Sequence, residues 1–320
     1  MDLSLTPDHA RLRAAARAAF AAGGDPPLVA GPLTELAIVA RELGRAAVPS
    51  PFHADVLARL LGWDDPDRAA VALDVRPPAP SRDPTGVPGG PPTLTGVADF
   101  VPHAGAAAWL LVPLGPDAVA QVDRRGPGVA VTPQATIADD ARCRVELSGA
   151  PVVRTWAADV TGATARAAVV LAADAVGAAE AALDAAVAHV SERRQWGAPL
   201  GTRQAVQHRC ADMLIDVTQA ADAVLDAAGV ADRGAPEAEV RLAASAAKAT
   251  ALPRCRRVTA AAHQLAGGQG VLADRPFHRW YRRVKAAEPT LGDVRAHRDA
   301  VATALLAGET LSSLAGGGTP

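Results

Sequence analysis

The spacing of apolar positions along the chain separates two helical segments from a strand-rich segment between them. Apolar residues recur every seven positions over 169–190, which places one narrow stripe along a helix. Over 206–217 they follow the i, i+4, i+7, i+8, i+11 spacing of a second amphipathic helix. A third helix is expected over 237–265, where Pro253 would kink or break the helix, and a fourth is expected over 294–306. Residues 159–314 are therefore predicted to form a four-helix bundle.

The first 67 residues are predicted to form a separate, shortened helical domain. The run Thr6–Asp8 is typical of a helix start, because threonine caps, proline fits the first helical position and an acid favours the first turn. A helix is expected to follow over 10–22, with two more over 33–43 and 52–61.

Residues 68–158 change to short β-rich runs that are separated by turn residues. The expected strands lie in the runs RAAVALDV, TLTGVADFVPHA, AAAWLLVPL, AVAQVDRR, GVAVTPQ and RCRVELSGAPV. A loop is expected over 77–92, and the glycine-rich tail 315–320 is expected to be disordered. The predicted fold class is α+β, with an N-terminal helical domain, a middle β-barrel or sandwich and a C-terminal four-helix bundle.

Charge and composition exclude several classes of function. A net charge of −2 and a pI near 6.4 argue against nucleic acid as the partner, because phosphate recognition needs a basic surplus. Three scattered cysteines predict neither a disulfide framework nor a metal site, which favours a reducing, cytoplasmic location. No run approaches about 20 apolar residues, so no membrane span is expected.

Candidate chemistry gathers where the first bundle helix is expected to end. The run Glu192-Arg193-Arg194-Gln195-Trp196-Gly197 places two guanidiniums and an indole at this break. Arginine forms bidentate bonds to phosphate, and tryptophan offers a flat face to a base. Taken alone, the run is better explained by arginines that complement the dipole at a helix C-terminus.

A second candidate run, HQLAGGQG over 263–270, ends the third bundle helix. Gln264 lies on the last turn, while Gly267 and Gly268 would let a backbone approach closely and offer N–H donors to an anion. An ordinary glycine C-cap explains the same residues, so this run is weak evidence alone. The run that follows, FHRWYRRVK, combines basic residues with Trp280 and Tyr281, and most of its arginines are better explained as a solvated charged face.

Together these runs resemble the acyl-CoA dehydrogenase family. ERRQWGAPLGTRQAVQHRCADM is similar to the family run E-R-x-Q-F-G-x-P-I-x-x-F-Q-x-x-Q-x-x-L-A-D-M, and HQLAGGQG is similar to Q-x-x-G-G-x-G. LTGVADFVPHAGAAAWLLV resembles the core of the family's β domain, L-x-G-x-K-x-[FW]-[IV]-x-x-A-x-x-A-D. The similarity extends over nearly the whole chain. Within the family, the chain resembles short bacterial members that form α2β2 heterotetramers in actinobacterial steroid or lipid catabolism.

The resemblance implies an FAD-dependent oxidoreductase that forms a homodimer or an α2β2 heterotetramer with a base-carrying homologue. An electron-transferring flavoprotein is the implied electron acceptor. Carried over by position, the residues that would hold FAD phosphate or lie at its adenine end are Arg193, Gln195 and Trp196. Those that would meet its pyrophosphate from the adjacent subunit are Gln264, Gly267 and Gly268. Those that would flank the flavin ring are Val101, Pro102 and His103.

The family's catalytic base, a glutamate that removes a proton from Cα of the acyl group, has no direct counterpart. Aligning the glycine of the family run Y-E-G-T with Gly292 puts Leu291 at the base position. Asp293 is the candidate base if the loop shifts by two residues, and Glu288 is a poorer one. The third explanation is that this chain has no base.

The family's CoA-binding arginine is also displaced. Ala168 falls at its position, and Arg166, two residues earlier, is the candidate that would contact the substrate. The expected function is FAD-dependent α,β-desaturation of an acyl-CoA, or of a carrier-bound acyl group, by one subunit of a heteromeric enzyme. Two alternatives remain open: a non-catalytic subunit that completes an FAD site or acts as a scaffold, and a biosynthetic flavoenzyme redirected on the same scaffold.

Overall fold

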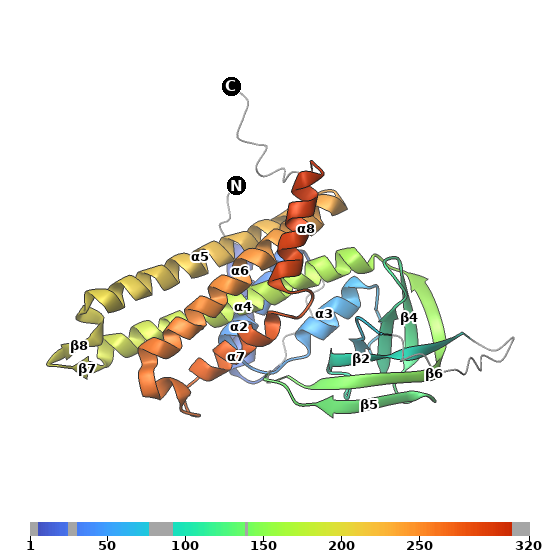
Figure 1. Cartoon of the computed structure of the whole chain (residues 1–320), viewed down its shortest axis with the longest axis horizontal. Helices are drawn as coiled ribbons and strands as arrows, with labels where there is room; N and C mark the ends of the chain where they lie inside the picture. Colours follow the sequence, from blue (N-terminus) through green and yellow to red (C-terminus); the bar gives the residue numbers. More distant parts are fainter. Residues whose placement is uncertain (1–5, 25–30, 77–91, 138–139, 309–320) are drawn as a thin grey trace, which may run out of the picture. The chain divides into compact units, whose positions relative to one another are not determined.

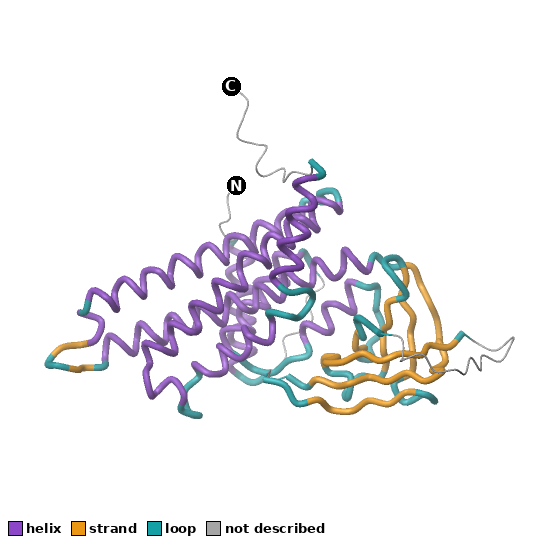
Figure 2. The backbone as a smooth tube through the Cα atoms, in the orientation of Figure 1, coloured by secondary structure: helices purple, strands orange, loops and turns teal. Residues whose placement is uncertain are grey.

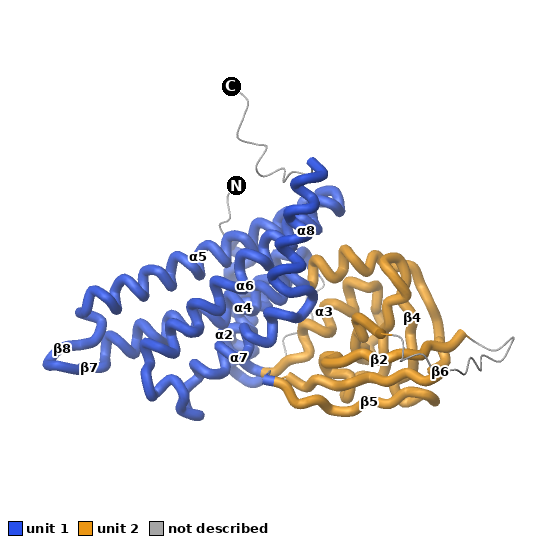
Figure 3. Tube along the Cα trace, viewed as in Figure 1, with its two compact units in different colours: residues 1–48, 137–139, 168–320 blue, residues 49–136, 140–167 orange. Residues whose placement is uncertain are grey.

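A computed structural model describes residues 6–24, 31–76, 92–137 and 140–308, drawn in Figures 1 and 2. The chain divides into a helical unit and a sheet unit (Figure 3). The helical unit comprises residues 1–48, 137–139 and 168–320, and the sheet unit comprises 49–136 and 140–167. The loop expected over 77–92, except its last residue, and the tail expected to be disordered lie outside the described residues.

The helices of the helical unit follow the predicted pattern with two differences. Their bounds are α1 (Pro7–Ala21), α2 (Leu33–Ala46), α4 (Val160–Glu192, which starts in the sheet unit), α5 (Gln204–Asp232), α6 (Glu237–Ala266), α7 (Phe277–Ala287) and α8 (Val294–Leu306). Of the two outcomes predicted at Pro253, a kink or a break, the break is wrong, because α6 continues through this proline. The run FHRWYRRVK forms α7, on which Trp280 is buried. Its three arginines are half-buried and Arg283 forms an ion pair with the buried Asp174, so the solvated face predicted for most of these arginines is also wrong.

Two glycines let α2 and α4 cross at close range. A β-carbon at Gly44 on α2 would overlap the carbonyl oxygen of Asp174. One at Gly177 on α4 would overlap the carbonyl oxygen of Arg41. The Asp174 carboxylate, 2% exposed, accepts hydrogen bonds at 2.6 and 2.7 Å from Arg283 on α7. The glycine crossing and this bidentate ion pair thus join three helices of the unit.

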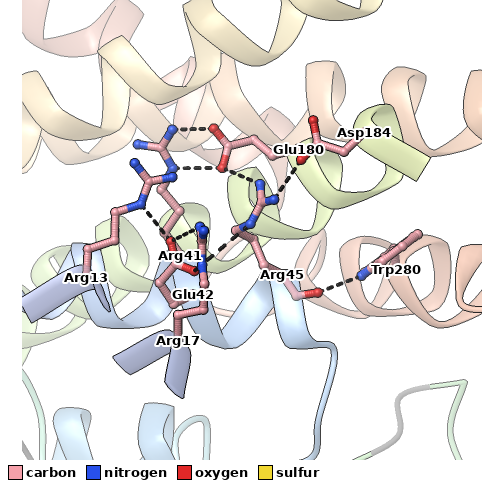
Figure 4. A network of polar contacts seen from close by, with 8 residues as sticks. All are labelled: Arg13, Arg17, Arg41, Glu42, Arg45, Glu180, Asp184 and Trp280. Carbon is pink, nitrogen blue, oxygen red and sulfur yellow. Dashed lines mark hydrogen bonds and ion pairs between the residues drawn. The ribbon is translucent and has the colours of Figure 1, made fainter. Parts of the chain in front are cut away.

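A buried carboxylate on α2 holds α1 in place (Figure 4). The Glu42 side chain is 1% exposed and accepts hydrogen bonds from Arg13 at 2.8 Å and from Arg17 at 2.7 and 3.0 Å. Burial alone would raise the pKa of the Glu42 carboxyl, but the hydrogen bonds and charges of both arginines outweigh it and lower the pKa. α1 itself buries only Ala16 and Phe20, so its attachment depends strongly on these ion pairs.

The same network continues from α2 to α4 and α7 (Figure 4). Arg41 donates to Glu180 at 2.9 Å, and Arg45 donates to Asp184 at 2.6 Å. The backbone carbonyl of Arg45 accepts a hydrogen bond from the Trp280 indole at 3.0 Å. Burial opposes the charge of Arg41, but its contacts with Glu180 raise its pKa overall. Charged side chains therefore continue the α2–α4 contact beyond the two glycines.

The sheet unit is a curled six-stranded sheet in which β6 belongs to both halves. Its elements are α3 (Phe52–Leu60), β1 (Ala69–Val71), β2 (Thr93–Pro102), β3 (Trp109–Pro113), β4 (Ala118–Asp123), β5 (Val129–Gln134) and β6 (Arg142–Ala157). The strand order is β1-β3-β4-β6-β2, with β5 also paired to β6. β6 pairs with β5 over 142–147, with β2 over 142–151 and with β4 over 152–157. The predicted strands and the α+β class are confirmed.

Gly177→Ala is expected to lower the free energy of unfolding by about 2 kcal/mol or more, because the new methyl group cannot fit against the α2 backbone. Gly229→Ala on α5 is the matched control: its methyl group would meet only the end of Arg233, at 3.5 Å, so helix propensity should raise stability by about 0.5–1 kcal/mol. Chemical denaturation measures both. Equal effects of the two substitutions would contradict the close crossing.

Glu42→Gln is expected to lower the free energy of unfolding by about 1–2 kcal/mol at pH 7, because it removes the charge that two partly exposed arginines share with a buried side chain. A folded-state pKa below the unfolded value means that this contribution is present above pH 4.5 and is lost as the pH falls through the folded pKa. The difference from wild type should therefore shrink in acid. Denaturation midpoints from pH 3 to pH 8 test this, with Glu35→Gln, also on α2, as the control.

Candidate functional site

The break after α4 is a two-residue β-hairpin. β7 (Arg194–Gln195) pairs with β8 (Ala198–Pro199), and the central residues Trp196 and Gly197 both have positive φ, at 51° and 81°. This is the pattern of a type I′ turn, in which a tryptophan at the first central position is strained. The Trp196 side chain is 76% exposed, and the guanidinium of Arg203 lies 5.4 Å from its ring centroid. Among the described residues, Arg203 is the recorded contact of this ring, which otherwise stays open to solvent.

The hairpin leaves the Arg193 guanidinium available for an anion. Its backbone N–H donates to His189 and its carbonyl accepts from Leu200, both at 2.8 Å. Within the described part of the chain, its exposed side chain makes no recorded ion pair or hydrogen bond. Gln207 donates to the Gly201 carbonyl at 3.0 Å and so supports the connection that follows the hairpin. Gln195, at the hairpin itself, is exposed.

The diglycine run lies where α6 ends. Gly267 has φ 57° and its N–H donates to the carbonyls of His263 and Gln264, so glycine is favoured there by the helix cap itself. Gly268 has no positive φ, and a β-carbon on it would meet nothing within 4 Å. Nothing in the described chain therefore requires glycine at 268. The open backbone there fits the approach of a group from outside.

The β7–β8 hairpin and the end of α6 lie at the same end of the helical unit (Figure 1). α5 and α6, of 29 and 30 residues, run in opposite directions, which returns the end of α6 to the level of the hairpin. A short helix η2 (Gly267–Val271) continues from α6. Next to it the His263 ring packs edge-on against Tyr281 of α7 at 5.6 Å. Burial lowers the pKa of the His263 imidazole, and the nearby His278 lowers it further.

The residues expected to flank the flavin ring lie at a bulge of β2 in the sheet unit. Val101 is 2% exposed and belongs to the core, whereas its neighbour Phe100 is 52% exposed with φ 57°. The Phe100 N–H donates to Gln134 at 2.7 Å, which fixes the strained backbone. His103 also has positive φ, and burial lowers the pKa of its imidazole. Phe100 is the exposed side chain here. The sequence reasoning passed over it, although it matches the aromatic of the family run.

The two carboxylates around the expected base position are both engaged. Asp293 is the N-cap of α8, where its carboxylate accepts from the Ala296 N–H at 2.8 Å. Glu288 forms ion pairs with Lys285 at 2.5 Å and Arg256 at 3.1 Å. Between them Leu291 is half-buried, with φ 60°. Asp293 as base stays a prediction that would require it to leave its cap.

A buried lysine contacts the same turn. Lys248 on α6 is 0% exposed, and its ammonium donates to the carbonyls of Thr290 and of Gly292, the latter at 2.6 Å. Burial lowers its pKa to about 7, while the nearby Asp293 carboxylate acts in the opposite direction. The sequence reasoning missed Lys248, whose signal was a lone charge within the alanine-rich run AASAAKATAL.

Arg166, the candidate substrate residue, lies near the start of α4 within the sheet unit. It is half-buried, and its guanidinium donates to the Gly162 carbonyl one turn earlier at 3.3 Å. In the described ranges no cluster of three or more His, Cys, Asp or Glu side chains has a metal-binding arrangement. The helices that the structure describes include none with the length and apolar character of a membrane span.

Comparison with known proteins identifies the family. Residues 157–306 match the model described as acyl-CoA dehydrogenase, C-terminal domain. Acyl-CoA dehydrogenase IpdE2 of Mycobacterium tuberculosis is 31% identical over 278 residues, which cover 83% of this chain and 76% of that protein. Other curated relatives, probable acyl-CoA dehydrogenases FadE25 of Mycobacterium, are 39% identical over 134 residues. That alignment covers 42% of this chain and only 34% of the relative, about a third of its length.

Solved structures agree with the sequence matches. The Tcur3481-Tcur3483 steroid ACAD G363A variant has a TM-score of 0.76 at 28% identity, covering 94% of this chain and 89% of that one. The ChsE4-ChsE5 complex from Mycobacterium tuberculosis has a TM-score of 0.82 at 22% identity, covering 96% and 99%, which shows a shared fold. The chain belongs to the acyl-CoA dehydrogenase family, as its sequence runs predicted.

Proposed function

We propose that this chain is an FAD-binding subunit of a heteromeric acyl-CoA dehydrogenase. The observation that carries the proposal is a set of features at one end of the helical unit that the chain's own fold does not explain. Trp196 is strained and exposed, Arg193 lacks a partner in the described chain, and Gly268 has an open backbone. An aromatic face, a free guanidinium and accessible N–H groups are what an adenine diphosphate requires.

These residues fit FAD chemically. Arg193 would bind phosphate, with Trp196 and Gln195 near the adenine end. From a neighbouring subunit, Gln264 and the Gly268 N–H would donate to the pyrophosphate. Gly267, whose own N–H caps α6, would let the pyrophosphate approach closely. When bound, FAD supplies acceptance of a hydride from Cβ of the acyl group.

In the sheet unit, the β2 bulge offers groups that suit a flavin ring. Phe100, with Pro102 and His103 beside it, offers an aromatic face and polar groups for the flavin ring. The bulge holds Phe100 exposed, whereas Val101 anchors the strand in the core. In this assignment the buried Val101 anchors β2 in the core and does not contact the flavin ring.

The turn between α7 and α8 supports a heteromeric enzyme. Removal of a proton from Cα needs a free carboxylate, but Glu288 is ion-paired and Asp293 caps α8. A homologous partner would supply the base in its own subunit, while this chain completes the FAD site. Pairing of two related chains is also what the names Tcur3481-Tcur3483 and ChsE4-ChsE5 describe for those structural relatives. The acyl group would arrive as a CoA or carrier-bound thioester, with Arg166 as its candidate contact.

A second candidate is a self-sufficient enzyme in which Asp293 is the base. It is favoured by the exposure of Asp293 and by its place two residues after Leu291. In that case Asp293 would have to give up its hydrogen bond to Ala296 and move toward the acyl group.

Arg193→Ala, Trp196→Ala and Gly268→Ala are each expected to lower FAD affinity about tenfold or more without lowering the stability of the flavin-free protein. None of the three substitutions removes a contact that the fold needs. The first two remove a proposed FAD contact, and the third places a methyl group where the pyrophosphate would approach. Fluorescence titration with FAD and thermal unfolding measure the two quantities. Arg11→Ala, which removes an exposed arginine on α1, is the control. Unchanged FAD affinity in all three variants would reject the assigned site.

Asp293→Asn separates the two candidate functions. Asparagine also caps helices, so the fold should be retained, and flavin bleaching by acyl-CoA thioesters under anaerobic conditions should change less than about twofold. The assay compares this chain alone with the chain assembled with a glutamate-carrying homologue. Bleaching is expected only in the assembly. Bleaching by the chain alone, together with a loss of about 10²-fold or more in Asp293→Asn, would establish the second candidate instead.

A further inference from the structure

The turn between α7 and α8 has a backbone conformation that its own sequence does not favour. Leu291 and Gly292 are consecutive residues in the left-handed region, at φ 60° and 88°. The left-handed conformation of a leucine costs about 1–2 kcal/mol, so surrounding contacts must favour this shape. A β-carbon at Gly292 would lie 3.0 Å from the Nε2 atom of His297, so the turn also packs closely against α8.

Three consecutive carbonyls of this turn accept hydrogen bonds from only two side chains. The Lys248 ammonium donates to the carbonyls of Thr290 and Gly292. The His297 imidazole donates from Nε2 to the Leu291 carbonyl at 2.9 Å, because a carbonyl can only accept. The turn is thus gripped from α6 by the lysine and from α8 by the histidine.

The protonation of His297 follows from this arrangement. With the proton on Nε2, a neutral ring has a free lone pair on Nδ1, which accepts from the Ser245 hydroxyl at 3.2 Å. Burial lowers the pKa of His297, and the charge of Lys248 lowers it further, whereas the Leu291 carbonyl and Asp293 oppose this. Ser245 and Lys248 lie three residues apart on α6, so one face of that helix supports the whole cluster.

The helix that follows the turn packs against α6. α8 has no fully buried residue among those described. Its N-cap, Asp293, comes directly after Gly292. Fixing the carbonyls on either side of Leu291 therefore fixes the start of α8 as well.

We propose that Lys248 and His297 are positioning residues that lock the Thr290–Leu291–Gly292 turn and the start of α8 in one arrangement. The locked turn has an apolar residue at its centre and keeps Asp293 as a helix cap. The two-residue shift that would turn Asp293 into a base would break three carbonyl hydrogen bonds. For this last consequence the inference rests on the proposed function, since it explains why the base must come from the partner.

Hydrogen exchange of α8, measured by mass spectrometry on the purified full chain, tests the lock. Lys248→Met and His297→Leu are each expected to increase exchange of α8 peptides about tenfold or more, because each removes hydrogen bonds that anchor the helix start. His297→Gln keeps an amide donor that can reach the Leu291 carbonyl, so it should restore exchange to near the wild-type rate. A general packing role for His297 would give no such rescue.

The control is Arg257→Met, which removes another cation of α6 whose partner is Asp216 on α5. It should leave α8 exchange unchanged. Exchange of α8 at the wild-type rate in both Lys248→Met and His297→Leu would overturn the proposal. If Lys248→Met does not fold, the comparison of His297→Leu with His297→Gln decides by itself, and equal exchange in these two variants overturns the proposal.

The ring state of His297 gives a second, independent measurement. Nitrogen-15 NMR of the wild-type chain should show a neutral imidazole protonated on Nε2 at pH 7, with its signal assigned by comparison with His297→Gln. Protonation on Nδ1 alone would overturn the lock. Neither measurement requires flavin or substrate, so a failed lock is distinguished from a failed assignment of FAD binding.

Discussion

The close crossing of α2 and α4 is the constraint on which the helical unit depends. Gly44 and Gly177 allow the two backbones to touch, which brings the carboxylates of α4 within reach of arginines on neighbouring helices. Asp174 then holds α7 through Arg283, and Glu180 holds α2 through Arg41. Aromatic residues make up only 3% of the chain. Small residues and ion pairs therefore make helix–helix contacts that large aromatic side chains often make in other proteins.

This rigid interior contrasts with the features assigned to the cofactor. Trp196 and Phe100 are exposed aromatics with left-handed backbone conformations, and each is fixed by its own β-structure. Strain that persists at exposed positions is typical of binding sites, where the contact that uses it comes from outside the chain. The lock formed by Lys248 and His297 is a buried counterpart, since it holds a strained turn directly before Asp293, which caps α8.

Helix and strand positions were largely predictable because periodicity and turn residues determine them locally. Thr6 caps α1 as predicted, and the apolar stripe over 169–190 lies within α4. Long-range partners were not predictable in this way. The basic run of α7 gave no sign that Arg283 pairs with Asp174, and Lys248 carried no motif that pointed to a turn 42 residues later. The family runs predicted Arg193 and Gly268 as FAD contacts, and this stays a prediction. The hairpin that exposes Trp196 follows from backbone geometry.

The central claim is that one FAD diphosphate is held between two chains, by Arg193 of one and the diglycine backbone of the other. Native mass spectrometry at several protein concentrations tests this most directly, because it reports FAD occupancy separately for each oligomer. Binding across an interface links cofactor and assembly by mass action, so FAD should occur on dimers and larger species and should increase their fraction. FAD bound equally well to the isolated monomer would contradict the account.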